Sequence, residues 1–267
     1  MNLDLSGSVA VVFGAASGIG HAIAAGFAAE GAHVALTDVS PNVGDAAKSL
    51  IRPGIRTRGD VVDATNYAAV QATSEAIFAD FGRVDHIVFA VGAGSGKFGF
   101  PFWKLDPSDW DRVIRINLTA AVNVAHAFAQ RLAEAKTGTM VFLSSVAGQI
   151  GSQTDPPYSA AKAGLINFAQ CAAKDLAPFG VRVNTICPGM VQTPLNRSVW
   201  QSWADRQPPE TWLSYEDWTA EKIKKIVPLN RWQTPDDIAA MAVFLASARG
   251  ANITGQTINV DGGYVMR

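Results

Sequence analysis

The sequence predicts an α/β fold in which one parallel sheet is covered by helices on both faces. Short apolar runs rich in β-formers alternate with Ala-rich helical stretches along the chain. Several of the apolar runs lack in-and-out alternation, as strands buried on both faces do. The chain has 267 residues, of which 48% are hydrophobic, so it can build one large core. We therefore expect a single domain over residues 1–267.

Seven strands and six helices are expected. The strands are 9–13, 33–37, 55–60, 86–91, 139–144, 181–186 and 257–260. The helices are 18–30, 41–50, 65–81, 107–135, 157–177 and 235–247. The last helix has a clear start, because Thr234 can cap it and Pro235 fits its first position. Residues 189–226 show no regular pattern, and we expect an irregular substrate lid there.

Composition excludes several classes of function. The net charge is −1 without a basic stripe, which argues against nucleic-acid binding. No apolar run reaches the roughly 18 residues that a membrane span needs, and residues 1–5 do not start a secretory signal. Cys171 and Cys187 lie in apolar segments, so we expect two buried thiols and no disulfide. The histidines are scattered, so no metal site is expected, and we infer a soluble cytoplasmic protein.

A glycine-rich loop lies between the first strand and the first helix. Gly14, Gly18 and Gly20 let the backbone approach a pyrophosphate, and the helix start offers free N–H groups. Asp38 ends the second strand about 20 residues later, where an acid can bind the ribose hydroxyls of a dinucleotide. The plain alternatives are an ordinary turn for the loop and a strand-end turn residue for Asp38.

Tyr158 and Lys162 stand four residues apart, on one face of an expected helix. A cation beside a phenol favours the phenolate and lowers its pKa from about 10. Such a phenol can exchange a proton with an alcohol or ketone. Taken alone, the pair also fits an ordinary solvated helix face.

Together these motifs resemble the short-chain dehydrogenase/reductase family, from about residue 5 to the C-terminus. The further matches are Asp60-Val61, Asn117, Ser145, Pro188-Gly189, Thr193 and the tail 254–263. The resemblance implies a Rossmann-type doubly wound sheet of strand order 3-2-1-4-5-6-7. It also implies hydride transfer between a nicotinamide cofactor and a secondary alcohol or ketone.

The resemblance assigns roles to four catalytic residues. It implies that Tyr158 is the general acid and base and that Lys162 lowers its pKa and holds the nicotinamide ribose. It implies that Ser145 orients the substrate oxygen and that Asn117 supports a water in a proton path. Taken alone, Ser145 also fits a strand-end cap, and Asn117 a satisfied buried amide.

The resemblance also implies a set of cofactor-binding residues. Asp60 and Val61 are expected at the adenine. The whole set is Gly14, Ser17, Gly18, Ile19, Gly20, Asp38, Asp60, Val61, Ala90, Gly92, Tyr158, Lys162, Pro188, Gly189, Val191 and Thr193.

Two positions depart from the family pattern. Phe13 stands where the family has Thr, and Phe89-Ala90-Val91-Gly92 where it has Asn-Asn-Ala-Gly. Replacing both partners of a polar contact by apolar groups can be nearly neutral. We interpret the pair of changes as a repacked sheet centre.

The resulting hypothesis is an NAD-dependent alcohol dehydrogenase or ketone reductase. NAD is expected because Asp38 repels the extra phosphate of NADP and neither Val39 nor Ser40 supplies a cation. Ala15 and Ala16 supply none in the loop either. The rival hypotheses are a non-catalytic dinucleotide sensor and a structural subunit of the same fold.

Two finer expectations concern the partners. Helices 107–135 and 157–177 carry apolar residues on more than one side, which predicts a homotetramer. Clustered aromatics predict an apolar or aromatic substrate, or else a lid packed against the body. They are Trp200, Trp203, Trp212, Tyr215, Trp218, Phe98, Phe100, Phe102 and Trp103.

Overall fold

A computed structural model describes residues 3–152 and 154–266 and shows one seven-stranded parallel sheet. The strand order is β3-β2-β1-β4-β5-β6-β7, and each neighbouring pair is parallel. The predicted fold class and strand order are confirmed. The strands are β1 Val9–Phe13, β2 His33–Asp38, β3 Thr57–Val61, β4 His86–Phe89, β5 Thr139–Leu143, β6 Arg182–Pro188 and β7 Thr257–Val260.

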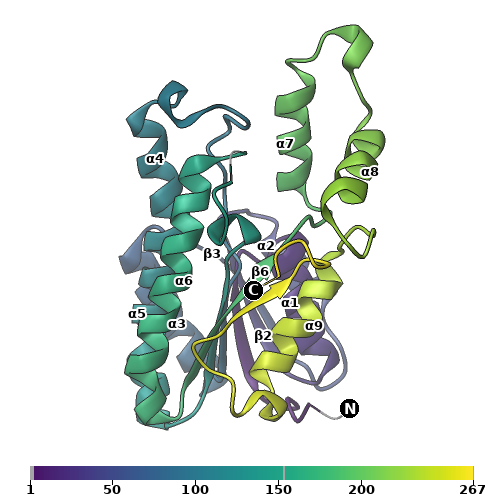
Figure 1. Cartoon of the computed structure of the whole chain (residues 1–267). Coiled ribbons are helices and arrows are strands. Elements are labelled where there is room, and N and C mark those ends of the chain that lie inside the picture. Colours follow the sequence, from purple (N-terminus) through teal and green to yellow (C-terminus); the bar gives the residue numbers. More distant parts are fainter. Residues whose placement is uncertain (1–2, 153, 267) are drawn as a thin grey trace.

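Helices cover both faces of this sheet (Figure 1). Helices α3, α5 and α6 lie on one side, and α1 and α9 on the other. The helices are α1 Gly18–Ala29, α2 Val43–Ser49, α3 Tyr67–Phe81, α4 Pro107–Ile114, α5 Ala120–Ala135, α6 Pro156–Leu176, α7 Pro194–Ala204, α8 Tyr215–Ile226 and α9 Pro235–Ala246. Thr234 starts α9 as expected, because its N–H donates to Asp237 Oδ2 at 2.8 Å.

The central strand β1 contributes to two separate cores. Ala10 and Val12 face the α1 and α9 side, whereas Val11 and Phe13 face the α3 and α5 side. All the side chains of β1 are therefore buried. This explains why the strand is apolar throughout and shows no alternation in the sequence.

The helix expected over 107–135 is divided into α4, a π-helical turn Arg115–Thr119 and α5. Asn117 Nδ2 donates to the Val113 carbonyl at 2.9 Å. In an α-helix that carbonyl would accept from the backbone N–H of Asn117. The Asn117 side chain therefore occupies the carbonyl that its backbone N–H would otherwise use, and the helix widens into a π-helical turn. Such widened turns occur frequently at functional sites.

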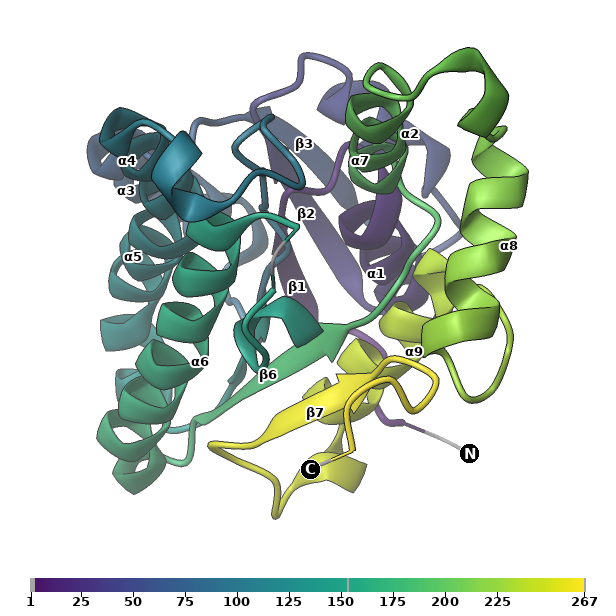
Figure 2. The ribbon, with the colours of Figure 1, turned by 45° about the horizontal axis from the view of Figure 1, so that its top comes forward.

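The stretch 189–226 was expected to be irregular, and this expectation is wrong, because it contains α7 and α8. Thr193 caps α7 by accepting from Asn196 N, with Pro194 at the first helical position. Ser214 caps α8 by accepting from Asp217 N at 3.1 Å. Both helices extend beyond the sheet on the side where α4 also stands (Figures 1 and 2).

None of the helices described is both long enough and apolar enough to span a bilayer.

Candidate active site

A cavity of about 1280 Å³ opens at the carboxyl ends of the central strands. Its walls include Gly14 after β1, Gly92 after β4, Ser145 after β5 and Gly189 after β6. The strand order reverses between β1 and β4, and ligands of open α/β sheets bind at such a switch point. Figure 2 shows this end of the sheet between α4, α7 and α8.

The glycine loop forms one wall of the cavity and depends on its glycines. A Cβ on Gly20 would lie 2.0 Å from the carbonyl oxygen of Gly14, so helix α1 could not begin so close to β1. Gly14 adopts φ +82°, a left-handed conformation that favours glycine. Ser17, Gly18, Ile19 and Gly20 also line the cavity, and the start of α1 therefore faces it.

Asp38 lines the same cavity at the end of β2. Its Oδ2 accepts from Ala16 N at 3.0 Å, and its Oδ1 accepts from Ser40 N at 2.9 Å. The carboxylate therefore ties the glycine loop to the turn after β2. It keeps acceptor capacity for a ligand, because each carboxylate oxygen has two lone pairs.

Ser145, Tyr158 and Lys162 converge on the same cavity. Tyr158 and Lys162 lie near the start of α6, and Ser145 follows β5. The backbone fixes this arrangement, because Ser144 Oγ donates to the Lys162 carbonyl at 2.8 Å. A Cβ on Gly148 would lie 2.8 Å from the Lys162 carbonyl carbon, so only glycine allows this close approach.

Lys162 is 2% exposed, and its Nζ donates to the carbonyls of Leu143 at 2.8 Å and Val91 at 3.4 Å. The same Nζ lies 5.5 Å from the centroid of the Tyr158 ring. Burial lowers the pKa of Lys162 to about 7. The ammonium is therefore held by backbone acceptors at the end of β5 and after β4.

Burial also raises the pKa of Tyr158 to about 12, although a hydrogen bond with Ser145 lowers it. Asp155 and Cys187 raise it further. We expected Lys162 to lower the pKa of Tyr158, but in the protein alone the pKa is raised by burial, and the hydrogen bond with Ser145 is what opposes the rise. A second positive charge, such as that of an oxidised nicotinamide ring, would lower the pKa of Tyr158.

Asn117 is fully buried beneath this group. Its Nδ2 donates to Ala93 O at 2.8 Å as well as to Val113 O, and its Oδ1 accepts from Ala93 N at 3.3 Å. Both N–H groups are thus used, and only a lone pair of Oδ1 remains for a further donor. A Cβ on Gly92 would lie 3.3 Å from that Oδ1 and 3.4 Å from Lys162 Nζ, which shows how closely the three residues pack.

Comparisons with known proteins agree with this geometry. The family described as enoyl-(acyl carrier protein) reductase matches residues 14–265. D-threitol dehydrogenase of Mycolicibacterium smegmatis is 36% identical over 264 residues, which cover 98% of this chain and 95% of that protein. The chain belongs to the short-chain dehydrogenase/reductase family. The predicted reaction class, hydride transfer between a nicotinamide cofactor and an alcohol or ketone, is confirmed with it.

Two solved structures of the family are similar over the whole fold. L-sorbose reductase from Gluconobacter frateurii, complexed with NADPH and L-sorbose, has a TM-score of 0.91 and 28% identity. The alignment covers 100% of both chains. An NAD+-bound xylitol dehydrogenase has a TM-score of 0.88 and 28% identity, covering 97% of this chain and 100% of the other.

The expected contact of Asp60 and Val61 with an adenine stays a prediction, and the two residues lie outside the wall of the cavity. Arg58 donates to both carboxylate oxygens of Asp60, at 2.7 and 2.9 Å, and Val61 is 61% exposed. Neither lines the cavity, whereas Asp63 and Ala64 do. The reason is that β3 continues to Val61, which pairs with Asp38, so the chain reaches the cavity only beyond it.

The turn between β3 and α3 lines the cavity instead. Asn66 caps α3 by accepting from Ala69 N, and this cap stands three residues after Asp63. Asp63 and Ala64 therefore lie in the short turn that joins the two elements, where they face the cavity.

The two departures from the family pattern meet at the sheet centre, as interpreted. Phe13 and Phe89 are register partners of β1 and β4, and both are fully buried. Their rings pack edge-on or tilted against Phe128 and Phe142, with centroids 6.1 and 6.4 Å apart. Apolar contacts therefore replace the polar ones, while Ala90 and Gly92 still line the cavity.

Most of the clustered aromatics do not face the cavity. Of the nine, Phe98 and Trp218 line it. Trp200 packs against Trp212 and Tyr215 within the α7–α8 hairpin, with centroids 6.1 and 5.7 Å apart. These three residues therefore pack within the hairpin, whereas Phe102 and Trp103 are 64% and 71% exposed. The cavity also holds residues that the sequence reasoning missed, namely Asp155, Tyr264, Arg112, Arg115, Lys222 and Lys225.

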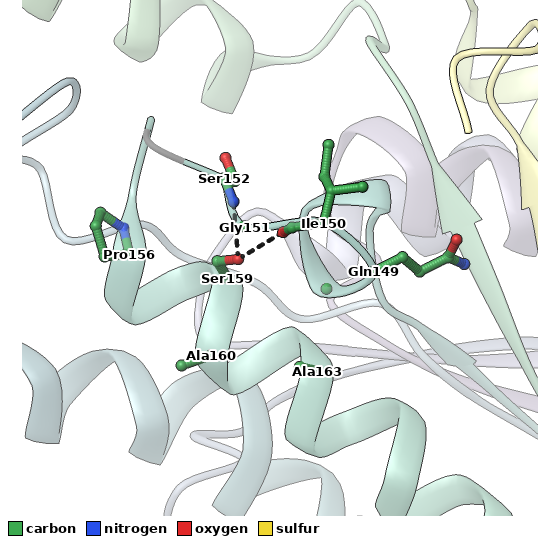
Figure 3. A pocket seen from close by; sticks show the side chains of 9 residues that line it. Gln149, Ile150, Gly151, Ser152, Pro156, Ser159, Ala160 and Ala163 are labelled. Carbon is green, nitrogen blue, oxygen red and sulfur yellow. Dashed lines mark hydrogen bonds between the residues drawn. The ribbon is translucent and has the colours of Figure 1, made fainter. Parts of the chain in front are cut away.

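A second, shallower pocket of about 410 Å³ lies beside the start of α6 (Figure 3). Ser159 lines this pocket, and its Oγ–H donates to the Ile150 carbonyl at 3.2 Å. No titratable side chain lines it in the described part of the chain.

Cys171 is exposed, contrary to expectation, and Cys187 is buried. Residues 3–152 and 154–266 contain no group of three or more His, Cys, Asp or Glu side chains that could hold a metal ion.

Proposed function

We propose that this protein is an NAD-dependent dehydrogenase of secondary alcohols, with ketone reduction as the reverse reaction. The observation that carries the proposal is the single cavity, which joins the glycine loop and Asp38 to Ser145, Tyr158 and Lys162. The nicotinamide supplies the hydride acceptor or donor when it is bound. The protein supplies orientation and a proton path.

Each side chain has one task in this proposal. Ser145 orients the substrate oxygen by a hydrogen bond, and Tyr158 exchanges a proton with that oxygen. Lys162 provides positive charge beside the phenol and binds the nicotinamide ribose. Asn117 holds the strand end at Ala93 and offers its remaining Oδ1 lone pair to a water next to Lys162. Pro188, Gly189, Val191 and Thr193 line the cavity after β6, and Thr193 lies next to Gly18 of the glycine loop.

The preference for NAD follows from charge near Asp38. NADP carries an additional phosphate on the adenosine ribose, which the Asp38 carboxylate repels. Arg58, on the neighbouring strand β3, is ion-paired with Asp60 at 2.7 Å and with Asp80 at 3.5 Å. It is therefore not free to neutralise that phosphate. Relatives differ here, because the sorbose reductase structure contains NADPH and the xylitol dehydrogenase structure NAD+.

One kinetic comparison tests the cofactor and the activity together. kcat/KM is measured with NAD and with NADP on the same secondary alcohol at one pH. We expect NAD to be favoured by on the order of 100-fold, because an unpaired carboxylate–phosphate contact costs a few kcal/mol. Equal or better efficiency with NADP contradicts the assignment of Asp38. Absence of hydride transfer across a panel of secondary alcohols favours the sensor or the structural subunit.

The substrate is proposed to be a small alcohol that reaches the cavity beneath α7 and α8, which serve as a lid. The expected apolar or aromatic substrate gains support only from Phe98 and Trp218. The relatives named above act on threitol, sorbose and xylitol by their names, which favours a hydroxylated substrate. A homotetramer and a cytoplasmic location stay predictions.

A further inference from the structure

Helix α8, which stands at the cavity end of the sheet (Figure 2), turns a positively charged face toward the cavity. The reaction described above makes no use of this face. The residues of α8 that line the cavity share one side of the helix, namely Trp218, Lys222, Lys225 and Ile226. The acids of α8 do not line the cavity, namely Glu216, Asp217 and Glu221. Charge is therefore segregated on α8, with its cations toward the cavity.

Lys222 is the less hydrated of the two lysines on this face. Its side chain is half-buried, whereas that of Lys225 is exposed. The Nζ of Lys222 lies 4.0 Å from the centroid of the Trp218 ring, so the ammonium rests against the indole. Burial lowers the pKa of Lys222, because its charged form loses part of its hydration. The ammonium thus lies at the cavity wall with less water around it than a surface lysine has.

No carboxylate of the protein balances this charge. None of the ion pairs formed within residues 3–152 and 154–266 includes Lys222. The positions three and four residues away on α8 hold no acid, but Trp218, Thr219, Lys225 and Ile226. The chain after α8 meets the C-terminal turn, where Leu229 N donates to Gly262 O at 3.1 Å. The acid of that turn, Asp261, accepts from two backbone N–H groups of its own segment.

The other cations of the cavity have partners or a neighbouring acid. Lys162 donates to two backbone carbonyls. Arg112 Nη1 donates to a carbonyl of the loop after β4 at 3.3 Å. Arg115 stands one helical turn after Asp111, an acid that also lines the cavity. In the described part of the chain, Lys222 donates to no carbonyl and faces no acid. An oxyanion suits such an ammonium, because a charge-assisted hydrogen bond is stronger than one to a neutral group.

We propose that Lys222 binds an anionic group of the substrate, a carboxylate or a phosphate, on the side of the cavity that α8 forms. The substrate class is then a secondary alcohol that carries such a group away from the reacting carbon. Lys222 is a specificity residue that touches the substrate but takes no part in the proton or hydride transfer. This inference rests on the proposed function and adds a substrate class to it.

The test compares charged substrates with neutral ones of similar size. 3-Hydroxybutanoate and 6-hydroxyheptanoate, which place the carboxylate at different distances from the reacting carbon, are compared with their methyl esters. Glycerol 3-phosphate is compared with glycerol. The ratio of kcat/KM for the charged member to that for the neutral member is measured with NAD for each pair. A hydrogen bond to a charged group is worth about 10- to 100-fold. We expect the wild type to show a ratio of this size in at least one pair.

Two substitutions assign this preference to Lys222. Lys222→Met removes the charge but keeps an unbranched side chain beside Trp218, and it should bring the ratio close to one. Lys222→Arg keeps the charge and should retain most of the preference. A preference confined to the acid pairs identifies the anion as a carboxylate, and one confined to the glycerol pair identifies it as a phosphate. The matched control is Lys224→Met, which removes an exposed lysine of α8 that does not line the cavity and should leave the ratio unchanged.

Two other roles of Lys222 give different results. If Lys222 bound the pyrophosphate of the cofactor, Lys222→Met would raise the dissociation constant for NAD in a fluorescence titration and lower kcat/KM equally for both members of a pair. If it served only to pack α8 against the cavity wall, Lys222→Met would lower the melting temperature and again leave the ratio unchanged. Either result overturns the proposal.

Failure of this inference is distinguishable from failure of the proposed function. If the wild type oxidises the neutral alcohols with NAD and prefers no charged member, the role of Lys222 is wrong and the dehydrogenase assignment stands. If it oxidises none of these substrates nor any of a broad panel of secondary alcohols but binds NAD, the proposed function itself fails.

Discussion

Lys162 lies against Tyr158, with its Nζ 5.5 Å from the centroid of the phenol ring, but donates its hydrogen bonds to Leu143 and Val91. Both groups are unfavourably placed for charge, because burial raises the pKa of Tyr158 to about 12 and lowers that of Lys162 to about 7. The pair therefore favours the neutral phenol until another positive charge is added. A positive charge brought into the cavity by a ligand would shift this balance toward the phenolate.

The first prediction concerns the phenol. Tyr158→Phe should lower kcat about 100- to 10,000-fold, the usual range for general acid–base catalysis. Dissociation constants for NAD should change little, since the ring remains. Tyr67→Phe, at a tyrosine outside the cavity that bonds His126 at 2.7 Å, is the matched control. A Tyr158→Phe enzyme within a few-fold of the wild type would refute the assignment.

The second prediction concerns pH. In alcohol oxidation Tyr158 must accept a proton. kcat/KM for the alcohol should therefore rise as pH increases through the pKa of Tyr158 in the enzyme with NAD bound. Lys162→Met removes a side chain whose charged form, present below its pKa of about 7, favours the phenolate, so activity below that pH should be lost and the rise should move to higher pH. The methionine suits the buried site, because Lys162 is 2% exposed. A full pH profile for both proteins checks this, and a profile unchanged in position would show that Lys162 does not tune the phenol.

Much of this fold could be predicted because its strands are buried on both faces. The central strand β1 was delimited correctly from five consecutive apolar residues. The glycine loop could be placed because Gly20 and Gly14 approach so closely that no side chain fits between them. Such steric demands restrict the residue type at a position, and the sequence then shows them directly.

The errors arose where local pattern and tertiary context differ. Asp60 and Asp63 are the same residue type three positions apart, and only the end of the β3 pairing decides which of them lines the cavity. The widened turn at Asn117 depends on one side-chain hydrogen bond that no periodicity reveals. Asp155 gave no signal in the sequence, because its place beside the cavity depends on the loop after β4, where Ser95 N donates to its Oδ2 at 2.8 Å.

The third prediction concerns assembly. Val122 on α5 is 37% exposed, an apolar side chain on a helix that already packs against the sheet on its other side. In a homotetramer that buries this face, Val122→Arg should shift the mass in light scattering toward smaller species. The monomer fold should persist in circular dichroism, since the site is exposed. The control is Val61→Arg, on the edge strand β3, which should leave the mass unchanged. A wild type that is monomeric at micromolar concentration contradicts the prediction.

The last prediction concerns acid sensitivity and His86. This histidine at the start of β4 is 7% exposed, bonds Thr139 Oγ1 at 2.9 Å and stacks on Phe27 with centroids 5.5 Å apart. Burial lowers its pKa to about 4; Asp85 opposes the shift, whereas Arg182 and Arg83 add to it. Between pH 6.5 and 4 the unfolded chain binds a proton here that the folded chain does not, so stability falls as pH falls through this window.

The expected size of the effect is on the order of 2 kcal/mol at pH 5 for a shift of this kind. Urea unfolding at pH 7 and pH 5 measures it. His86→Asn keeps a hydrogen-bonding group toward Thr139 and removes the titration, so its free energy of unfolding should fall less between the two pH values than that of the wild type. Thr139→Val keeps the histidine and should retain the acid sensitivity. An equal loss in the wild type and His86→Asn would mean that other groups govern acid unfolding, because His86 is then not the residue that gains the proton.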